Sequence, residues 1–367
     1  RGATQIEMTT RPGGNRIRGT LFEYFGNDAL NATSFMTNFY GGTKPAQRSN
    51  QFGGTVSGPV FLPKLYDGRN RTFFTFGYQG NREQGHDQVV SAVPTAAMRA
   101  GSFAGDATIY DPATTKPSGS GFVRDPFPGN AVPANRMDPV ALKIMEVALP
   151  LPNLPGATNN YVNSGATKQP SDMWNTRADH NFSEANRFTA RYLYRRQFNH
   201  NMVAYPGPGG TGSKGGQLRK DTFQHSVSAD NTHVLRPTLI NNAHFGYFRN
   251  YSPAWSPGTG EDWASKVGLK GVGPDKFPQM KFNPLTGIGG GAYAVQTPGN
   301  TFQFSDSLLT VHGRHTTKVG FEYRKLLYDT WDAGASSGNF NFSTLPTANI
   351  QNRRLGIAFA SYLLGIP

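Results

Sequence analysis

The chain of 367 residues contains no cysteine and no run of about 18 apolar residues. Without cysteine it has no disulfide framework, no zinc–thiolate site and no thiol nucleophile. Without a long apolar run it has no candidate transmembrane helix, because such a helix needs about 20 apolar residues to cross a bilayer. The longest apolar stretches, ALKIMEVAL (141–149) and LGIAFASYLLG (355–365), are too short. These absences exclude several chemistries and helical membrane spans, and they leave the compartment open.

The residues that usually fill a protein core are also scarce. The hydrophobic fraction is 37%, and the chain contains 44 glycines and 26 prolines. Aromatic residues are nevertheless abundant, with 26 Phe and 15 Tyr, and disordered chains avoid aromatics. We therefore expect a folded chain without a conventional core. The formal charge of +13 fits a nucleic-acid partner, an anionic surface or basic solvated loops.

Alternating segments recur along the chain, and the stretch QFGGTVSGPV (51–60) illustrates them. Phe52, Val56 and Val60 share one side with two glycines, whereas the other side is mostly polar. A period of two predicts a β-strand with one apolar and one polar face. A glycine-rich apolar face packs poorly against a protein core, but it is acceptable against lipid tails.

About nine such strands are expected, joined alternately by short turns and by long loops at 81–171, 197–220 and 251–299. Short connections at one end and long ones at the other are typical of a transmembrane barrel. We therefore predict an all-β fold, a partial antiparallel transmembrane β-barrel with long extracellular loops and short periplasmic turns. A soluble β-sandwich also alternates, but it explains the unequal connections badly. One helix is predicted in the first long loop, with Asp138 as N-cap and Pro139 at the first helical position.

The alternation assigns side chains to the two sides of the predicted barrel. Aromatic residues near strand ends (Tyr24, Phe52, Tyr78, Trp174 and Tyr194) are expected to form interfacial girdles. The residues predicted to face lipid are Phe22, Tyr24, Phe52, Val56, Val60, Phe74, Phe76, Tyr78, Tyr192, Tyr194, Phe245, Tyr247, Phe321 and Tyr323. The residues predicted to face the lumen are Glu23, Gln51, Thr55, Gln79, Arg191, Arg195, Lys318, Glu322 and Arg324.

Several motifs suggest chemistry without meeting its requirements. GPGGTGSKGG (207–216) lacks the Gly-Lys-Ser/Thr order of a phosphate loop, and GIGGGA (287–292) does not follow a buried parallel strand. His312 and His315 have no further ligands nearby for a metal. We expect no catalytic, cofactor or metal site and no enzyme activity. The basic and aromatic weave RFTARYLYRRQF (187–198) leaves a soluble nucleic-acid-binding protein as a distant alternative.

Several segments, in order, resemble TonB-dependent outer-membrane receptors of the Oar-like branch. QIEMTTRPGGNRIRGTLFEYFGNDALNA (5–32) is similar to the passage from plug to barrel, and NQFGGTVSGPV with RTFFTFGYQG is similar to the next two strands. VPTAAMRAGSFAG, IYDPAT, PFPGNAVPANRMDPVALKIM and LPLPN resemble the long loop of that branch. WNTRADHNFSEANRFTARYLY and GRHTTKVGFEYR continue the similarity.

The resemblance implies an outer-membrane barrel of about 22 strands with a plugged lumen in a Gram-negative bacterium. Residues 1–15 would be the last plug strand and the plug–barrel junction, and residues 16–367 the N-terminal part of the barrel. Because the chain opens on Arg1 in mid-pattern, we expect a fragment of a longer protein. The implied partners are outer-membrane lipid, an inner-membrane TonB-type energy coupler and an unknown extracellular ligand, with no nucleic acid and no cofactor. A surface protein that adheres without transporting is the alternative.

Overall fold

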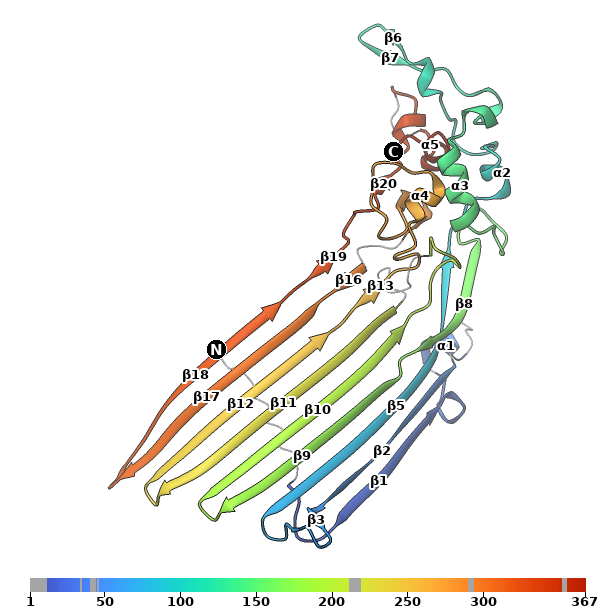
Figure 1. Cartoon of the computed structure of the whole chain (residues 1–367). Helices are drawn as coiled ribbons and strands as arrows, with labels where there is room; N and C mark the ends of the chain where they lie inside the picture. The colour runs from blue at the N-terminus through green and yellow to red at the C-terminus, as the bar shows by residue number, and fades with distance from the viewer. Residues whose placement is uncertain are drawn as a thin grey trace.

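The computed structural model describes residues 12–33, 35–39, 44, 46–210, 219–289, 294–351 and 355–367. Its main feature is one antiparallel sheet of long strands lying side by side (Figure 1). The long strands are β1 Arg18–Asn27, β2 Gln47–Pro59, β5 Thr72–Ser91, β8 Tyr161–Lys168, β9 Ser171–Ser183, β10 Asn186–His200, β11 Arg219–Arg236, β12 Leu239–Tyr251, β17 Pro298–His312 and β18 His315–Tyr328.

Strands β8 and β9 occupy one position in the sheet, because both pair with β5 and both meet β10. The described part of the sheet therefore has nine strand positions, in the order β1, β2, β5, β8/β9, β10, β11, β12, β17, β18. Short strands continue three of them: β13 Ala254–Trp255, β16 Ala294–Gln296 and β19 Trp331–Asp332. This arrangement confirms the predicted all-β, antiparallel architecture.

The connections are short at one end of the sheet. Two residues join β9 to β10, β11 to β12 and β17 to β18, and the turn after β17 contains Gly313 with a φ of 59°. Glycine tolerates that left-handed conformation. The connection from β2 to β5 is longer and carries the small hairpin of β3 Phe61–Leu62 and β4 Tyr66–Asp67. All the long connections lie at the opposite end, as the sequence predicted (Figure 1).

The strands extend further toward the long loops than the sequence pattern indicated. β5 continues to Ser91 and β8 begins at Tyr161, so the first long loop covers 92–160 rather than 81–171. The second lies between His200 of β10 and Arg219 of β11, and the third lies between Trp255 of β13 and Ala294 of β16. The prediction failed at these ends because EQGHDQVV (83–90) and ATKQ (166–169) place polar residues on both faces of the strand. Without a difference between a polar and an apolar face, the two-residue period that marks a strand cannot be recognised.

Residues 92–160, 201–210, 256–289, 333–351 and 355–367 gather into one body at the long-loop end of the sheet, named here the cap (Figure 1). Its small sheet has the order β15-β14-β20, and β6 pairs with β7 in a separate hairpin. The remaining elements are α1 Phe35–Phe39, α2 Ala96–Arg99, β6 Lys116–Ser118, β7 Gly121–Val123, α3 Pro139–Ala148, α4 Trp263–Val267, β14 Gln279–Phe282, β15 Leu285–Ile288, β20 Asn339–Asn341 and α5 Ala358–Leu363, with 3-10 turns Asp28–Leu30, Pro112–Thr114, Pro128–Asn130, Ala134–Arg136 and Leu345–Thr347.

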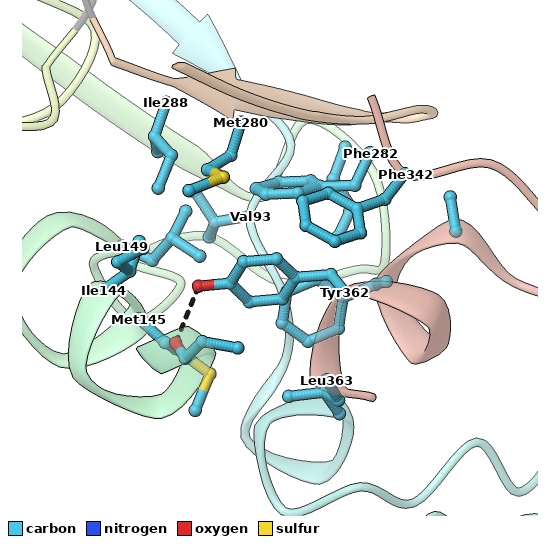
Figure 2. Close-up of a cluster of buried hydrophobic side chains, with 14 of the residues drawn as sticks. Val93, Ile144, Met145, Leu149, Met280, Phe282, Ile288, Phe342, Tyr362 and Leu363 are labelled. Atoms are coloured by element: carbon cyan, nitrogen blue, oxygen red, sulfur yellow. Dashed lines mark hydrogen bonds between the residues drawn. The ribbon is translucent and has the colours of Figure 1, made fainter. Parts of the chain in front are cut away.

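The buried hydrophobic core lies in the cap and not between the long strands. Of its buried members only Tyr161 belongs to a long strand, where it is the first residue of β8. Helices α3 and α5 supply much of this core, and they correspond to the two longest apolar stretches of the sequence. Tyr362 packs against Phe282 and Phe342 with ring centroids 5.1 and 5.2 Å apart (Figure 2).

The predicted helix in the first long loop is confirmed as α3. The Asp138 carboxylate accepts a hydrogen bond from the backbone N–H of Ala141 at 2.8 Å, and Pro139 is the first helical residue. An aspartate N-cap followed by proline is a favourable helix start. Among the helices of the described residues, none has the length and apolar character that a membrane crossing requires.

Candidate functional site

The register of the long strands defines two faces of the sheet. Directly paired residues lie on the same face, so a row can be followed from strand to strand. The polar face contains the row Arg18, Ser57, Thr75, Arg177, Arg191, Ser228, Gly246, Gln303 and Arg324. The apolar face contains the row Gly19, Val56, Phe76, Thr176, Tyr192, Val227, Tyr247, Phe302 and Lys325.

Most residues predicted to face lipid lie together on the apolar face of the sheet, and most residues predicted to face the lumen lie together on the polar face. The apolar face contains Phe52, Val56, Phe74, Phe76, Tyr78, Tyr192, Tyr194, Phe245, Tyr247, Phe321 and Tyr323. The polar face contains Gln51, Thr55, Gln79, Arg191, Arg195, Lys318, Glu322 and Arg324. Contact of the first set with lipid and of the second with a watery lumen stays a prediction.

The grouping of residues in β1 was wrong. Phe22 pairs with Gly53 and Tyr24 with Gln51, so both lie on the polar face, whereas Glu23 pairs with Phe52 on the apolar face. β1 has large apolar residues on both faces, so its own alternation does not reveal its phase. Only pairing with β2 fixes it.

Val60, also predicted to face lipid, lies one residue beyond β2. Its backbone N–H donates to Thr72 O at 2.8 Å, and Gly68 N–H donates to Val60 O at 2.9 Å. Val60 therefore belongs to the turn that leads to β5, and the strand register assigns it to neither face.

Aromatic side chains form a continuous row across the apolar face. The ring centroids of Phe52 and Tyr78 are 6.1 Å apart, those of Tyr78 and Trp174 5.4 Å, and those of Trp174 and Tyr194 5.3 Å. His225 extends the row at 4.7 Å from Tyr194. These residues match the predicted girdle except for Tyr24, which lies on the other face. Such rows mark the depth of membrane–water interfaces in outer-membrane barrels.

The polar face carries ion pairs near the short turns. Asp230 accepts hydrogen bonds from Arg191 at 2.9 Å and from His244 at 2.7 Å. Asp179 binds Arg177 at 2.7 Å and accepts from the Thr189 hydroxyl at 2.8 Å. Moving such charges from water into hydrocarbon is costly. This face is therefore suited to line an aqueous lumen.

Residues 12–16 lie against the polar face. Together with polar-face residues of β1, β2, β5 and β9 they line a groove of about 910 Å³. Asn15 holds this segment to the turn before β5, since the backbone N–H of Asn70 donates to Asn15 Oδ1 at 2.7 Å. A Cβ atom on Gly13 would lie 2.7 Å from Phe73 Cβ, which shows how closely the segment approaches the sheet. Residues 1–11, predicted as plug, lie outside the described residues.

The motifs set aside in the sequence lie partly outside the described residues. Only 207–210 of the glycine-rich loop and 287–289 of GIGGGA are described, and β15 ends at Ile288. His312 and His315 pair across the β17–β18 turn. No group of three His, Cys, Asp or Glu that could hold a metal occurs in the described part of the chain. The register also divides RFTARYLYRRQF between the two faces. Arg191 and Arg195 lie on the polar face, whereas Tyr192 and Tyr194 lie on the apolar face.

The cap is tied together by hydrogen bonds between loops far apart in the sequence. The buried Tyr362 hydroxyl donates to Ala141 O at 2.7 Å, and the Tyr205 hydroxyl donates to Thr286 O at 3.0 Å. Burial raises the pKa of Tyr205 to about 12 and also raises the pKa of Tyr362. Sequence reasoning missed the cap, although its two short apolar stretches were visible.

Comparison with known proteins gives one match. The model of the family described as "Outer membrane beta barrel domain" matches residues 9–367. No curated protein matches the chain, and no solved structure matches it. The match covers nearly the whole chain and agrees with the antiparallel sheet, its connections at the two ends and its two chemically distinct faces. The chain therefore belongs to the outer-membrane β-barrel family and is located in the outer membrane of a Gram-negative bacterium.

Proposed function

We propose that the chain is part of a TonB-dependent receptor of the Oar-like branch, which takes up an extracellular ligand through a plugged barrel. Its partners would be outer-membrane lipid, a TonB-type energy coupler of the inner membrane and a ligand of unknown identity. The chain would have no catalytic role and no nucleic-acid partner. The proposal extends the family assignment by the resemblance of residues 5–32 to a plug–barrel junction.

The position of residues 12–16 carries this proposal. They approach β1 along the polar face instead of from outside the sheet, as a chain leaving a plug inside the barrel must do. The Asn15–Asn70 contact places this approach at the short-turn end, which is the predicted periplasmic side. A coupler in the periplasm would act on a plug from that side.

The polar face and the cap would have different roles in ligand uptake. Ion pairs such as Arg191–Asp230 would keep the wall of the passage hydrated. The cap would offer the first contact to the ligand, since it is built from the loops at the predicted extracellular end. Because the loops at this end share one hydrophobic core, they would contact the ligand as one body.

The first test asks whether the segment before β1 belongs to a plug. In the intact receptor, deletion of the plug up to residue 16 should open the lumen and sensitise cells to vancomycin, a large antibiotic that the outer membrane excludes. Deletion of the β6–β7 hairpin, 116–123, is the control, because that hairpin lies at the far end of the cap (Figure 1). Equal sensitivity of both variants and the wild type would contradict the proposal.

The second test separates transport from adhesion. Cells with and without the receptor gene are grown with a ferric chelate as the sole iron source, or with an oligosaccharide or a peptide as the sole carbon or nitrogen source. Each growth test is done in a strain that contains the coupler and in a strain that lacks it. A transporter gives growth that needs both genes. The packed cap favours one alternative, a surface protein that presents a rigid binding face without transporting. Such a protein would let cells of both strains bind the ligand, but it would give neither strain a growth advantage over cells without the gene.

A further inference from the structure

Three arginines lie on the apolar face, next to the aromatic row and on its loop side. Arg82 follows Tyr78 by four residues in β5, and Arg196 follows Tyr194 by two in β10. Both strands run from the short turns toward the cap. At about 3.4 Å per residue, Arg196 lies about 7 Å beyond Tyr194 along its strand. Arg219, the first residue of β11, pairs with His200, four residues beyond Arg196 along β10.

A buried carboxylate holds the first two arginines. Asp172 accepts hydrogen bonds from Arg82 Nη2 at 2.7 Å, from Arg196 Nε at 3.0 Å and from the Tyr78 hydroxyl at 2.7 Å. The Asp172 side chain is 6% exposed, whereas each arginine side chain is 44% exposed. The anion is therefore covered and the two cations face outward, which leaves one net positive charge.

Arg219 repeats the arrangement beside them. Its Nε donates to Asp221 Oδ2 at 2.9 Å, and the Asp221 side chain is 2% exposed. The guanidinium carbon of Arg219 lies 5.9 Å from the ring centroid of Phe198. The guanidinium carbon of Arg196 lies 5.8 Å from the same centroid. Arg196 also lies 5.8 Å from the Trp174 ring. Ring faces and carboxylates thus fix the guanidinium groups before any ligand arrives.

Hydrogen-bonding capacity remains on these fixed groups. Within the described residues, neither Nη of Arg196 nor Nη1 of Arg219 donates a hydrogen bond. Planar guanidinium groups match the oxygens of a phosphate, and such charge-assisted bonds are about twice as strong as neutral ones. Aromatic girdles lie at the depth of lipid head groups. The available donors are therefore placed where a lipid phosphate would be.

We propose that Arg82, Arg196 and Arg219 form a binding site for the phosphate of an anionic lipid in the outer leaflet, with Asp172 and Asp221 as positioning residues. The site requires that the apolar face meet lipid. It does not require transport, so it can fail or hold independently of the proposed function. Sequence reasoning missed it because Asp172 lies on β9, whereas its partners Tyr78, Arg82 and Arg196 lie on the neighbouring strands β5 and β10.

The test uses the intact receptor in phosphatidylcholine nanodiscs that contain diphosphoryl lipid A or its dephosphorylated form. Lipid bound to the protein is counted by native mass spectrometry. The wild type should retain the phosphorylated lipid preferentially, and the double variant Arg196→Gln/Arg219→Gln should lose affinity for it about tenfold. Arg195→Gln is the matched control, since Arg195 neighbours Arg196 but donates to Gln197 on the polar face.

Three results would overturn the proposal. The first is equal retention of the two lipids by the wild type, a comparison that needs no folded variant. The second is unchanged affinity of the double variant, and the third is an equal loss in Arg195→Gln. Quenching of Trp174 by brominated lipid checks the orientation of the face. Its absence would also overturn the lipid site, while leaving the plug test of the proposed function unaffected.

Discussion

The ring of Phe22 lies over the backbone of Gly53 in the neighbouring strand. A Cβ atom at Gly53 would come within 2.7 Å of Phe22 Cζ and 2.3 Å of the backbone oxygen of Tyr78. On the other face, Leu21 covers Gly54 in the same way, at 2.6 Å from its Cδ2. Glycine in β2 thus makes room for side chains of β1, an arrangement in which large side chains compensate for glycines in a sheet. The sequence interpretation had explained the apolar-face glycine Gly54 by lipid contact alone.

Replacement of Gly53 by alanine should therefore destabilise the barrel. We expect a loss of about 1–3 kcal/mol in the free energy of unfolding, because the new methyl group forces the Phe22 ring and the β5 backbone apart. Urea unfolding of the intact protein in lipid vesicles, followed by tryptophan fluorescence, measures the change. Gly26→Ala in β1 is the control, since its nearest neighbour, Ser49 Cβ, would lie 3.6 Å away. Equal losses in both variants would contradict this account.

The phase of β1 can be tested with cysteine, because the chain has none of its own. Single variants Leu21→Cys and Phe22→Cys place a thiol on adjacent residues and opposite faces. If the polar face lines the lumen, a small water-soluble maleimide should label position 22 faster than position 21 in membrane vesicles. A lipid-soluble maleimide should reverse the order. The opposite ranking would restore the original assignment of Phe22 to the lipid side.

Fold class was predictable because a two-residue period and unequal connections are local properties of the sequence. Strands such as β10 and β18 have one polar and one apolar face, so their alternation alone fixed which side chains go together. β1 does not have this contrast, with Leu21 and Phe25 on one face and Phe22 and Tyr24 on the other. Which of its side chains lie on which face depends on hydrogen bonds to β2, whose paired residues are about 20 to 40 positions away in the chain.

The cap and the arginine site were unpredictable for a related reason. Tyr362 and Ala141 are 221 residues apart, and no local pattern says that the two short apolar helices share a core. Asp172 looks like an ordinary polar strand residue until Arg82 and Arg196 are brought to it from two neighbouring strands. Contacts between distant segments, rather than composition, create both features.

Acid should weaken the cap through Asp111. Two hydrogen bonds from Arg136, at 2.9 and 3.0 Å, hold the pKa of the Asp111 carboxyl below its usual range. A lowered folded-state pKa stabilises the cap at pH values above the unfolded pKa of about 4, and this contribution is lost as the pH falls through the folded value.

Limited proteolysis of the receptor at pH 7 and at pH 3 should therefore show faster cleavage in the cap at the lower pH. Asp111→Asn should remove part of this difference, because the amide does not titrate. Lys116→Gln is the control, as its ion pair with Asp125 is more than half exposed at both partners. A pH dependence that is identical in wild type and Asp111→Asn would show that this pair does not contribute.

Alkali should weaken the cap through Tyr205, which burial keeps protonated up to a pKa of about 12. The unfolded chain loses its tyrosine protons near pH 10, so between about pH 10 and 12 the folded state binds more protons than the unfolded state. The free energy of unfolding should then decrease as the pH rises through this window. Tyr205→Phe should lower stability at pH 7 by about 1 kcal/mol, because Thr286 O loses its hydrogen bond, and should flatten the decrease above pH 10. Denaturant unfolding at a series of pH values measures both effects. An unchanged alkaline slope in Tyr205→Phe would mean that the hydroxyl is accessible to water and that the cap core is open at this residue.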